Sequence, residues 1–199
     1  MTRALVIYCH PSSESFTAAV RDVVLAELAA EGARITLIDL YATEFDPVLS
    51  PEDFAAYGSP PPPVAPVADH VAALKAADTL IFIYPTWWYS HPARLKGWLD
   101  RVLLPEIAFG MPSHAGGDIR PGLTHVTRLG VFTTCGASRW LTFLIGAPGR
   151  RVLTRGVRLL CNRRTRIAFA AHYAMDSSTA ESRARHLRRV QRRMRQLLR

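Results

Sequence analysis

Short, continuous apolar runs recur along the chain, separated by segments in which apolar residues return with helical spacing. Apolar runs without polar alternation are typical of strands buried on both faces of a parallel sheet. These runs predict strands over residues 3–9, 35–40, 79–84, 126–134 and 166–172. The segments between and after them predict helices over about 15–31, 51–57, 67–77 and 92–102, from 139 onward, and over 178–198.

Strands that alternate with helices indicate a parallel sheet with helices on both faces. Five such strands suit a three-layer αβα architecture in the order 2-1-3-4-5, which is the order of the flavodoxin-like fold. We expect residues 1–199 to form a single domain of this α/β class, because the length suits one substantial core. The first, third and fourth strands are neighbours in this order, so the loops that follow them should converge on one site.

Proline and glycine mark the expected interruptions. Pro85 should end the third strand, because proline has no N–H to donate to the ladder. The helix that follows residue 138 should break at Pro148 and Gly149. Residues 58–66 (GSPPPPVAP) predict a stiff connector, partly polyproline II, and residues 105–124 predict a long irregular segment.

Charge is unevenly spread over the chain. The formal net charge is +9, yet residues 1–100 carry 6 Lys and Arg against 12 Asp and Glu, whereas residues 101–199 carry 19 against 4. The interpretation we favour is composition bias with solvated helix faces. The alternative is attraction to anions such as nucleotide phosphates, nucleic acid or an acidic membrane surface. We expect no nucleic-acid partner, and peripheral contact with a membrane stays open.

The cysteines and the first residues bear on the compartment. Cys9, Cys135 and Cys161 are odd in number and show no metal-binding spacing, so we expect no metal site and a reducing environment. The first nine residues have the pattern of a strand and not of a signal peptide. The sequence contains no run of about eighteen apolar residues, so it predicts no transmembrane helix. We therefore expect a cytoplasmic protein.

The loop after the first strand suits a phosphate. His10, Ser15 and Thr17 offer side-chain donors, and Ser15 is a good N-cap for the helix that follows. The N–H groups of Phe16 and Thr17 would begin that helix, where the helix dipole favours an anion. Neither a Walker motif nor a GxGxxG pattern is present, which argues against a P-loop nucleotide and a Rossmann-bound dinucleotide. The alternative is ordinary helix capping.

Three adjacent aromatic residues, Trp87, Trp88 and Tyr89, follow the third strand. Ligands of open α/β sheets bind beyond the carboxyl ends of the strands, and large neighbouring rings there suit a flat, stackable ligand. The alternative is that the rings pack on a neighbouring loop or a partner subunit. The loop at residues 133–136 could offer hydroxyl and backbone N–H groups to a ring edge, or could be an ordinary strand-to-helix turn.

Four segments carry a family resemblance: HPSSESFT (10–17), IDLYATEFDPVLSPEDF (38–54), IYPTWWYSHPARLKGWLDRV (83–102) and TTCG (133–136). Together they resemble the flavodoxin-like NAD(P)H:quinone oxidoreductases. That group includes DT-diaphorase, the bacterial modulator-of-drug-activity proteins and the ancillary oxidoreductases of potassium efflux systems. The resemblance covers residues 4–136 well and the remainder weakly, and the PAxLKGWxDR part of the third segment is its most specific feature.

The resemblance implies a bound flavin and assigns roles to named residues. The loop that holds the flavin phosphates is matched by His10, Ser15, Phe16 and Thr17. The loop along the isoalloxazine ring is matched by Pro85, Thr86, Trp87, Trp88 and Tyr89. The aromatic pair that walls the substrate pocket, and so acts in catalysis, is matched by Trp88 and Tyr89. The loop at the pyrimidine side of the ring is matched by Thr133, Thr134, Cys135 and Gly136.

The chain departs from the family pattern in two places. Cys135 stands where the family usually has glycine. Trp140 matches the position of a family tyrosine but has no hydroxyl, so the proton donor to the reduced flavin is left open. FAD is slightly favoured over FMN, although the sequence shows no adenine-binding signature.

The resemblance implies an NAD(P)H-dependent flavoenzyme that reduces quinone-like acceptors by two-electron, ping-pong hydride transfer. It also implies a homodimer whose site is completed by both chains, with the long 105–124 segment as a further reason. Two other classes stay open. A flavodoxin-type electron carrier is typically acidic, which the basic second half argues against. A flavin-binding regulatory subunit of a membrane transport system is suggested by the Arg-rich last helix.

Overall fold

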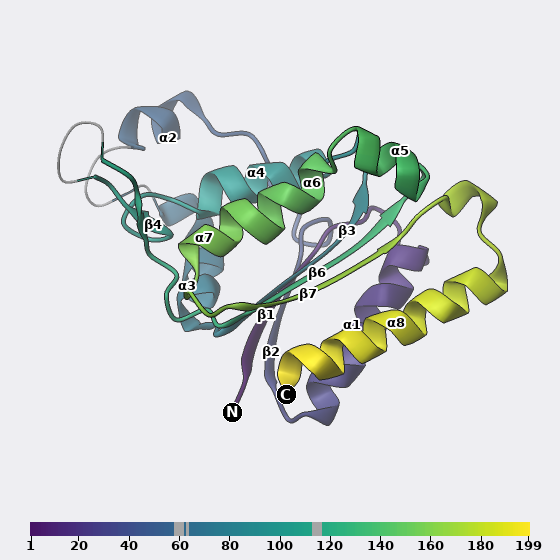
Figure 1. The fold of residues 1–199 in the computed structure, drawn as a ribbon. Coiled ribbons are helices and arrows are strands. Elements are labelled where there is room, and N and C mark those ends of the chain that lie inside the picture. The colour runs from purple at the N-terminus through teal and green to yellow at the C-terminus, as the bar shows by residue number, and fades with distance from the viewer. Residues whose placement is uncertain (58–61, 63, 113–116) are drawn as a thin grey trace.

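A single parallel sheet organises the molecule. The structure, a computed structural model, describes residues 1–57, 62, 64–112 and 117–199. The sheet contains, in spatial order, β2 (Arg34–Asp39), β1 (Arg3–Tyr8), β3 (Thr79–Thr86), β6 (Arg128–Cys135) and β7 (Arg166–His172), and every neighbouring pair is parallel. Counted along the chain, these strands confirm the predicted order 2-1-3-4-5 and the predicted three-layer architecture (Figure 1).

Helices cover both faces of the sheet. One face carries α1 (Phe16–Ala30) and α8 (Ala180–Leu198), which pack side by side. The other face carries α3 (Ala68–Ala76) and α4 (Ala93–Val102), together with the segment α6 (Pro148–Arg151), η2 (Val152–Val157) and α7 (Arg158–Leu160) (Figure 1). The remaining elements are α2 (Pro51–Ala56), η1 (Ala65–Val67), β4 (Phe109–Gly110), β5 (Arg120–Pro121), α5 (Arg139–Leu144) and η3 (Met175–Ser177).

Helix α4 buries one face, whose apolar residues recur at helical spacing. Leu95, Trp98, Leu99 and Val102 are all buried, and the Trp98 ring lies edge-on to Phe82 of β3 with centroids 5.9 Å apart. Burial of such side chains stabilises a fold by about 1.5–3 kcal/mol each. This packing fixes where α4 begins, and therefore where the loop between β3 and α4 stands above the sheet.

Strand β3 is longer than its proline suggests, which corrects the expectation that Pro85 ends it. β3 continues to Thr86, and Pro85 and Thr86 pair with Thr134 and Cys135 of β6. Ile83, two residues earlier, accepts the Cys9 N–H at 3.0 Å and so faces β1. Pro85 has the same orientation as Ile83, but β1 has already ended at Tyr8, so no ladder hydrogen bond is lost.

Two other expectations need adjustment, and a third lies mainly outside the described residues. The helix after residue 138 breaks at residues 145–147, and Pro148 begins α6 because proline suits the first turn of a helix. Within the segment 105–124, the described residues include the antiparallel pair β4–β5. The polyproline expectation for 58–66 falls mainly on residues 58–61 and 63, which lie outside the described residues. No helix in the described ranges is long and apolar enough to cross a membrane.

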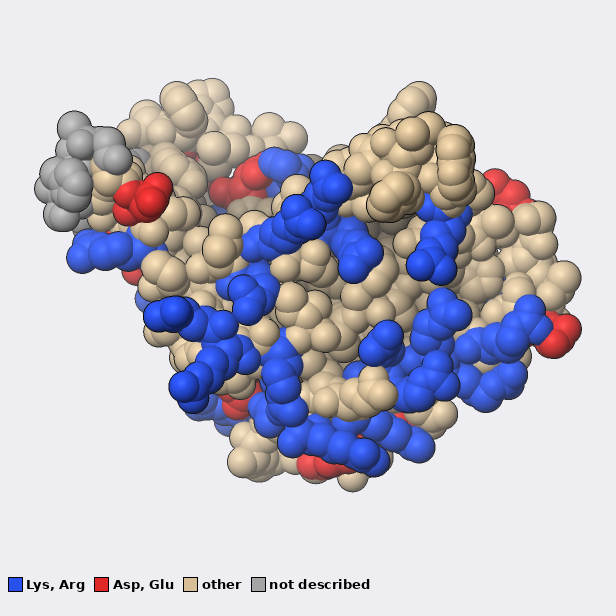
Figure 2. All heavy atoms as spheres, viewed as in Figure 1, with Lys and Arg blue, Asp and Glu red and all other residues tan. Residues whose placement is uncertain are grey.

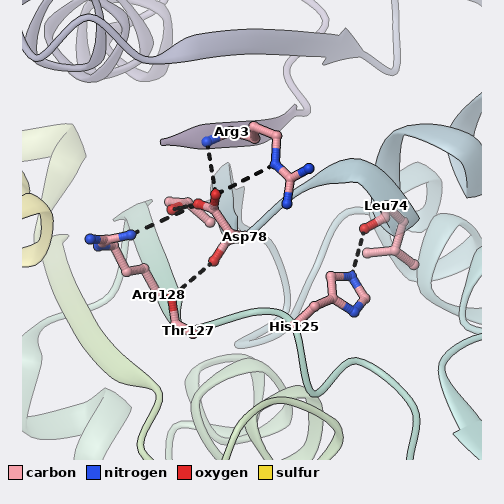
Figure 3. A network of polar contacts seen from close by, with 7 residues as sticks. Arg3, Leu74, Asp78, His125, Thr127 and Arg128 are labelled. Carbon is pink, nitrogen blue, oxygen red and sulfur yellow. Dashed lines mark hydrogen bonds and ion pairs between the residues drawn. The ribbon is translucent and has the colours of Figure 1, made fainter. Parts of the chain in front are cut away.

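Asp78 ties three strands together at the amino end of the sheet (Figure 3). Its carboxylate accepts the backbone N–H of Arg3 at 3.1 Å and the Thr79 hydroxyl at 2.9 Å. The guanidinium groups of Arg3 and Arg128 lie 3.7 and 3.8 Å from the same carboxylate. Its backbone carbonyl accepts the Thr127 N–H at 2.9 Å, so one residue connects the beginnings of β1, β3 and β6.

Candidate functional site

A cavity of about 820 Å³ opens at the carboxyl end of the sheet, where the loops after β1, β3 and β6 meet. This convergence follows from the strand order, as the sequence predicts. The cavity is lined by His10, Ser15, Phe16, Thr17, Pro85, Thr86, Trp87, Trp88, Tyr89, Thr134, Cys135, Gly136, Ala137, Met175 and Asp176. Every predicted site residue except Thr133 is therefore in its wall. Thr133 lies behind the wall, where its hydroxyl and that of Thr86 are 2.8 Å apart.

The N-terminus of α1 forms one end of the cavity. Ser15 is the N-cap, as predicted, and its hydroxyl accepts the Ala18 N–H at 3.1 Å. Phe16 and Thr17 are the first two residues of the helix, so their N–H groups have no intrahelical partner. The Thr17 hydroxyl lies 3.0 Å from that of Thr134, which joins this helix to β6. Backbone donors and the helix dipole together suit an anion at this end.

His10 stands at the same end with a defined orientation. Nδ1 of His10 lies 3.0 Å from the backbone nitrogen of Ser12 and 3.0 Å from its carbonyl oxygen, and these two contacts fix the orientation of the ring. Burial lowers the pKa of His10, which favours the neutral form of the ring. Its centroid lies 6.5 Å from that of Trp87, which links the first loop to the aromatic loop.

The aromatic residues occupy a tight turn with unusual backbone angles. Trp87 and Ser90 exchange two backbone hydrogen bonds, of 3.2 and 2.9 Å, around Trp88 and Tyr89. Trp88 and Tyr89 have φ of 48° and 59°, the left-handed values that a two-residue type I′ turn requires. Such turns normally use Asn or Gly, and bulky residues adopt these angles at a cost of about 1–3 kcal/mol each. This turn places Trp88, which is 94% exposed, at the mouth of the cavity.

Gly149 of α6 holds this turn in place. Its N–H donates to the Tyr89 carbonyl at 3.1 Å. A Cβ atom at Gly149 would stand only 3.0 Å from the Ser90 Cα and 3.2 Å from its carbonyl carbon. The close approach therefore needs a residue without a side chain. A glycine sixty residues further along the chain thus maintains the strained turn that carries the two aromatic rings.

The third predicted loop is partly strand. Thr133, Thr134 and Cys135 belong to the end of β6, and only Gly136 lies beyond it. The Cys135 side chain is buried, with Sγ 3.7 Å from the Thr142 hydroxyl of α5. A Cβ at Gly136 would lie 3.3 Å from a carboxylate oxygen of Asp176. Cys135 thus takes part in packing behind the wall, while the backbone of Gly136 faces the cavity.

Three lining residues were not among the predicted ones: Ala137, Met175 and Asp176. Met175 and Asp176 come from η3, which follows β7, the strand next to β6. The Ala174 N–H donates to the Ala137 carbonyl at 3.0 Å and ties this segment to the third loop. The available signal was topological, since any loop after β7 reaches the same edge of the sheet as the loop after β6.

Comparison with known proteins agrees with this architecture. The sequence model of a family described as having a flavodoxin-like fold matches residues 2–198. The chain therefore belongs to this flavodoxin-like family. The chain is also similar to a solved NAD(P)H:quinone oxidoreductase from Methanothermobacter marburgensis. That likeness has 26% sequence identity and a TM-score of 0.81, and it covers 98% of this chain and 96% of the other.

Curated relatives share part of the chain. A ribosyldihydronicotinamide dehydrogenase [quinone] of Homo sapiens is 31% identical over 126 residues, which are 55% of this chain and 54% of the relative. An uncharacterised NAD(P)H oxidoreductase of Escherichia coli, YcaK, is 34% identical over 109 residues, covering 54% of this chain and 56% of that protein. The chain thus spans about half the length of the curated relatives it matches.

Proposed function

We propose that this protein is a flavin-dependent oxidoreductase that transfers reducing equivalents from NAD(P)H to quinone-like acceptors. The proposal rests on one observation. The N-terminus of α1, the aromatic loop after β3 and the polar segment at the end of β6 line one cavity of about 820 Å³. The names of the relatives support the same reaction class. An exposed Trp88 beside this cavity favours an enzyme with a substrate pocket over a simple electron carrier.

The residues of the cavity fit a flavin. The N–H groups that begin α1 and the His10 ring suit a phosphate, while Trp87, Trp88 and Tyr89 suit the flat ring system. The volume lies within the range of cofactor pockets. We favour FAD slightly over FMN, following the resemblance to the quinone oxidoreductases. When bound, the flavin supplies the hydride chemistry, and the protein supplies binding and orientation.

The chain's own groups have three tasks in this proposal. The N–H groups of Phe16 and Thr17 hold the phosphate and so fix the distance of the ring from α1. The backbone N–H of Gly136 would offer one pre-oriented donor to the ring edge, and such a donor needs little reorganisation when charge develops there. The side chains of Trp88 and Tyr89 would stand beside the open face of the flavin ring, where NAD(P)H and the quinone bind one after the other.

We further propose a cytoplasmic homodimer whose second chain completes the site. Helix α5 follows the third loop directly and exposes a group of apolar side chains next to the cavity, with Trp140 69% and Phe143 79% exposed. Exposed apolar patches of this kind favour a protein partner. Light scattering should give twice the mass of one chain. A monomer that retains full activity would contradict this part of the proposal.

The flavin is tested by the absorbance spectrum of the purified protein and the mass of the cofactor released from it. We expect the two absorbance bands of an oxidised flavin, and the mass distinguishes FAD from FMN. A protein that neither contains flavin nor binds it when FAD or FMN is added would refute the proposal.

Whether the two substrates bind alternately or together is tested by steady-state rates over a grid of NAD(P)H and quinone concentrations. If both substrates use the one open face beside Trp88, they must alternate, and the double-reciprocal lines are parallel. Intersecting lines would show that both substrates bind at once and would contradict the single-pocket arrangement. The same measurement with NADH and with NADPH gives the preferred donor.

A further inference from the structure

One surface of the molecule, the basic face, is built by the last quarter of the chain. Residues 148–199 contain 15 arginines, no lysine and two acidic residues, Asp176 and Glu181. Figure 2 shows that basic side chains cover much of the surface over α6, α7 and α8, with Asp and Glu mainly at its margins. Residues 1–100 contain four arginines, so a uniform composition bias does not account for this concentration of charge.

The basic face borders the edge strand β7 on both sides. Above one side of the sheet, the guanidinium group of Arg150 in α6 lies over the Phe169 ring of β7, 4.5 Å from its centroid. Above the other side, Arg185 and Arg189 of α8 line one small cavity together with Ala171 of β7. Arginines from both helix layers therefore meet at the same lateral edge of the molecule.

Few of these charges are neutralised within the protein. Among the described residues, only two of the 15 arginines form an ion pair with an acidic side chain: Arg185 with Glu181, and Arg195 with Glu27. Along α8, Arg189 stands four residues before Arg193, and like charges at this spacing destabilise a helix. Charges that repel one another without internal partners favour a negatively charged partner outside the chain.

The side chains between the arginines indicate what kind of anionic partner fits. Val152 and Leu159 are exposed in the segment from α6 to α7, Leu159 to 67%. The two aromatic residues of this part of the chain, Phe169 and Tyr173, are both half-buried. Proteins that bind single-stranded nucleic acid present aromatic rings for stacking, whereas anionic membranes attract basic surfaces that also expose aliphatic side chains.

We propose that the basic face docks this protein on a membrane surface rich in anionic phospholipids. The guanidinium groups bind the lipid phosphates, which they match in geometry as well as in charge. The side chains of Val152 and Leu159 enter the headgroup region, where they gain from leaving water. The contact is peripheral and reversible, and it weakens as salt screens the charges.

The proposal is tested by sedimenting the full-length protein with lipid vesicles at physiological ionic strength. We expect binding to vesicles of equal parts phosphatidylcholine and phosphatidylglycerol and none to vesicles of phosphatidylcholine alone. The double variant Arg155→Gln/Arg189→Gln removes one unpaired charge from each side of β7. It should bind the acidic vesicles roughly tenfold more weakly or worse, because each basic residue near an anionic surface contributes a factor of about five.

Arg34→Gln/Lys75→Gln is the matched control. It removes the same total charge from exposed positions away from the basic face, since Arg34 begins the opposite edge strand β2 and Lys75 lies on α3, which contacts β1. We expect its affinity for acidic vesicles to stay within about twofold of the natural chain, because distant charges are screened. Equal losses in the two double variants, or no sedimentation with acidic vesicles, would overturn the proposal.

Leu159→Ser distinguishes a membrane from a nucleic acid as the partner. The substitution leaves the charge unchanged and should weaken vesicle binding roughly threefold or more, because an aliphatic side chain is lost from the contact. Binding of duplex DNA, measured in the same buffer, should be weaker than vesicle binding in the natural chain. Unchanged vesicle binding by Leu159→Ser, or tighter binding of DNA than of vesicles, would overturn the assignment to a membrane. None of these measurements requires turnover, so they stand apart from the proposed redox reaction.

Discussion

The two ends of the parallel sheet are built by opposite means. At the amino end, Asp78 satisfies backbone and charged partners from three strands within one compact network (Figure 3). At the carboxyl end, hydroxyl pairs such as Thr17 with Thr134 replace ion pairs, and the aromatic turn holds strained backbone angles above an open cavity. The carboxyl end therefore combines strain with open space, whereas the amino end is tied together by the Asp78 network. Changes at the amino end should therefore alter stability, and changes at the carboxyl end should alter function.

The largest effect is expected at the amino end. Asp78→Ala removes an acceptor from the Arg3 N–H and the Thr79 hydroxyl and leaves two guanidinium groups without their partner. We expect the free energy of unfolding to fall by about 2–3 kcal/mol, measured by chemical denaturation. Asp100→Ala, which breaks an exposed i,i+4 pair with Lys96, should cost less than about 0.5 kcal/mol. Equal losses in both variants would mean that the Asp78 network does not stabilise the fold.

The next effect concerns His186, one of the buried histidines near the carboxyl end of the sheet. Burial lowers the pKa of His186 to about 4, so the unfolded chain binds this proton more readily than the folded one. Stability should therefore fall as pH falls from about 6.5 to about 4, by on the order of 2–3 kcal/mol. Denaturation curves across this range, in phosphate-free buffer, should show a shallower decline for His186→Leu than for the natural chain. Parallel declines would rule out His186 as the cause.

Gly149→Ala probes the strained turn without touching the cavity. The added methyl group meets the Ser90 backbone at 3.0 Å, so the turn of Trp88 and Tyr89 must shift. We expect kcat/KM for the acceptor to fall roughly tenfold, because small misplacements at a site are costly, while flavin content is kept. Gly156→Ala is the control, since nothing lies within 4 Å of its added Cβ. Unchanged kinetics in Gly149→Ala would show that the turn is held by other contacts.

Trp88→Ala separates substrate binding from cofactor binding. Its ring is 94% exposed and walls the mouth of the cavity, so it should contact the acceptor more than the flavin. We expect acceptor turnover to fall roughly three- to tenfold, the size of one aromatic contact, with flavin affinity within about twofold. Flavin loss without a matching loss of turnover per bound flavin would contradict this division of roles.

The smallest effect is expected at Cys135. Its side chain points toward Thr142 and packs behind the cavity wall, so removing it should leave the flavin contacts intact. We expect Cys135→Gly to bind flavin at least as tightly as the natural chain, as measured by fluorescence titration. If the change abolished binding, the alignment of this loop with the family pattern would be wrong.

Sequence patterns were sufficient for the sheet and for most of the residues that line the cavity at its carboxyl end. Continuous apolar runs reveal buried parallel strands, and the strand order then places three loops together. The end of β3 could not be predicted from these patterns. Whether Pro85 loses a ladder hydrogen bond depends on whether β1 still lies beside it, and the sequence does not show where β1 ends relative to β3. The left-handed backbone angles of the turn at Trp88 and Tyr89 could not be predicted either. Trp88 and Tyr89 are unusual turn residues, and the contact that sustains their angles comes from the distant Gly149. The residues that η3 contributes to the cavity wall belong to a segment without a recognisable sequence motif, so they were not predicted.

The arginines around β7 have a consequence for the behaviour of the sheet as a whole. An open parallel sheet leaves two lateral edges whose unused backbone groups can recruit a strand from another molecule. β7 forms one of these edges, with Arg166 and Ile167 exposed at its start and basic residues of α7 and α8 on either side. A second molecule that approaches with its own β7 edge brings the same positive charge, and the two edges repel each other. The basic half of the chain therefore protects a β-edge against aggregation, most effectively at low ionic strength where the repulsion is least screened.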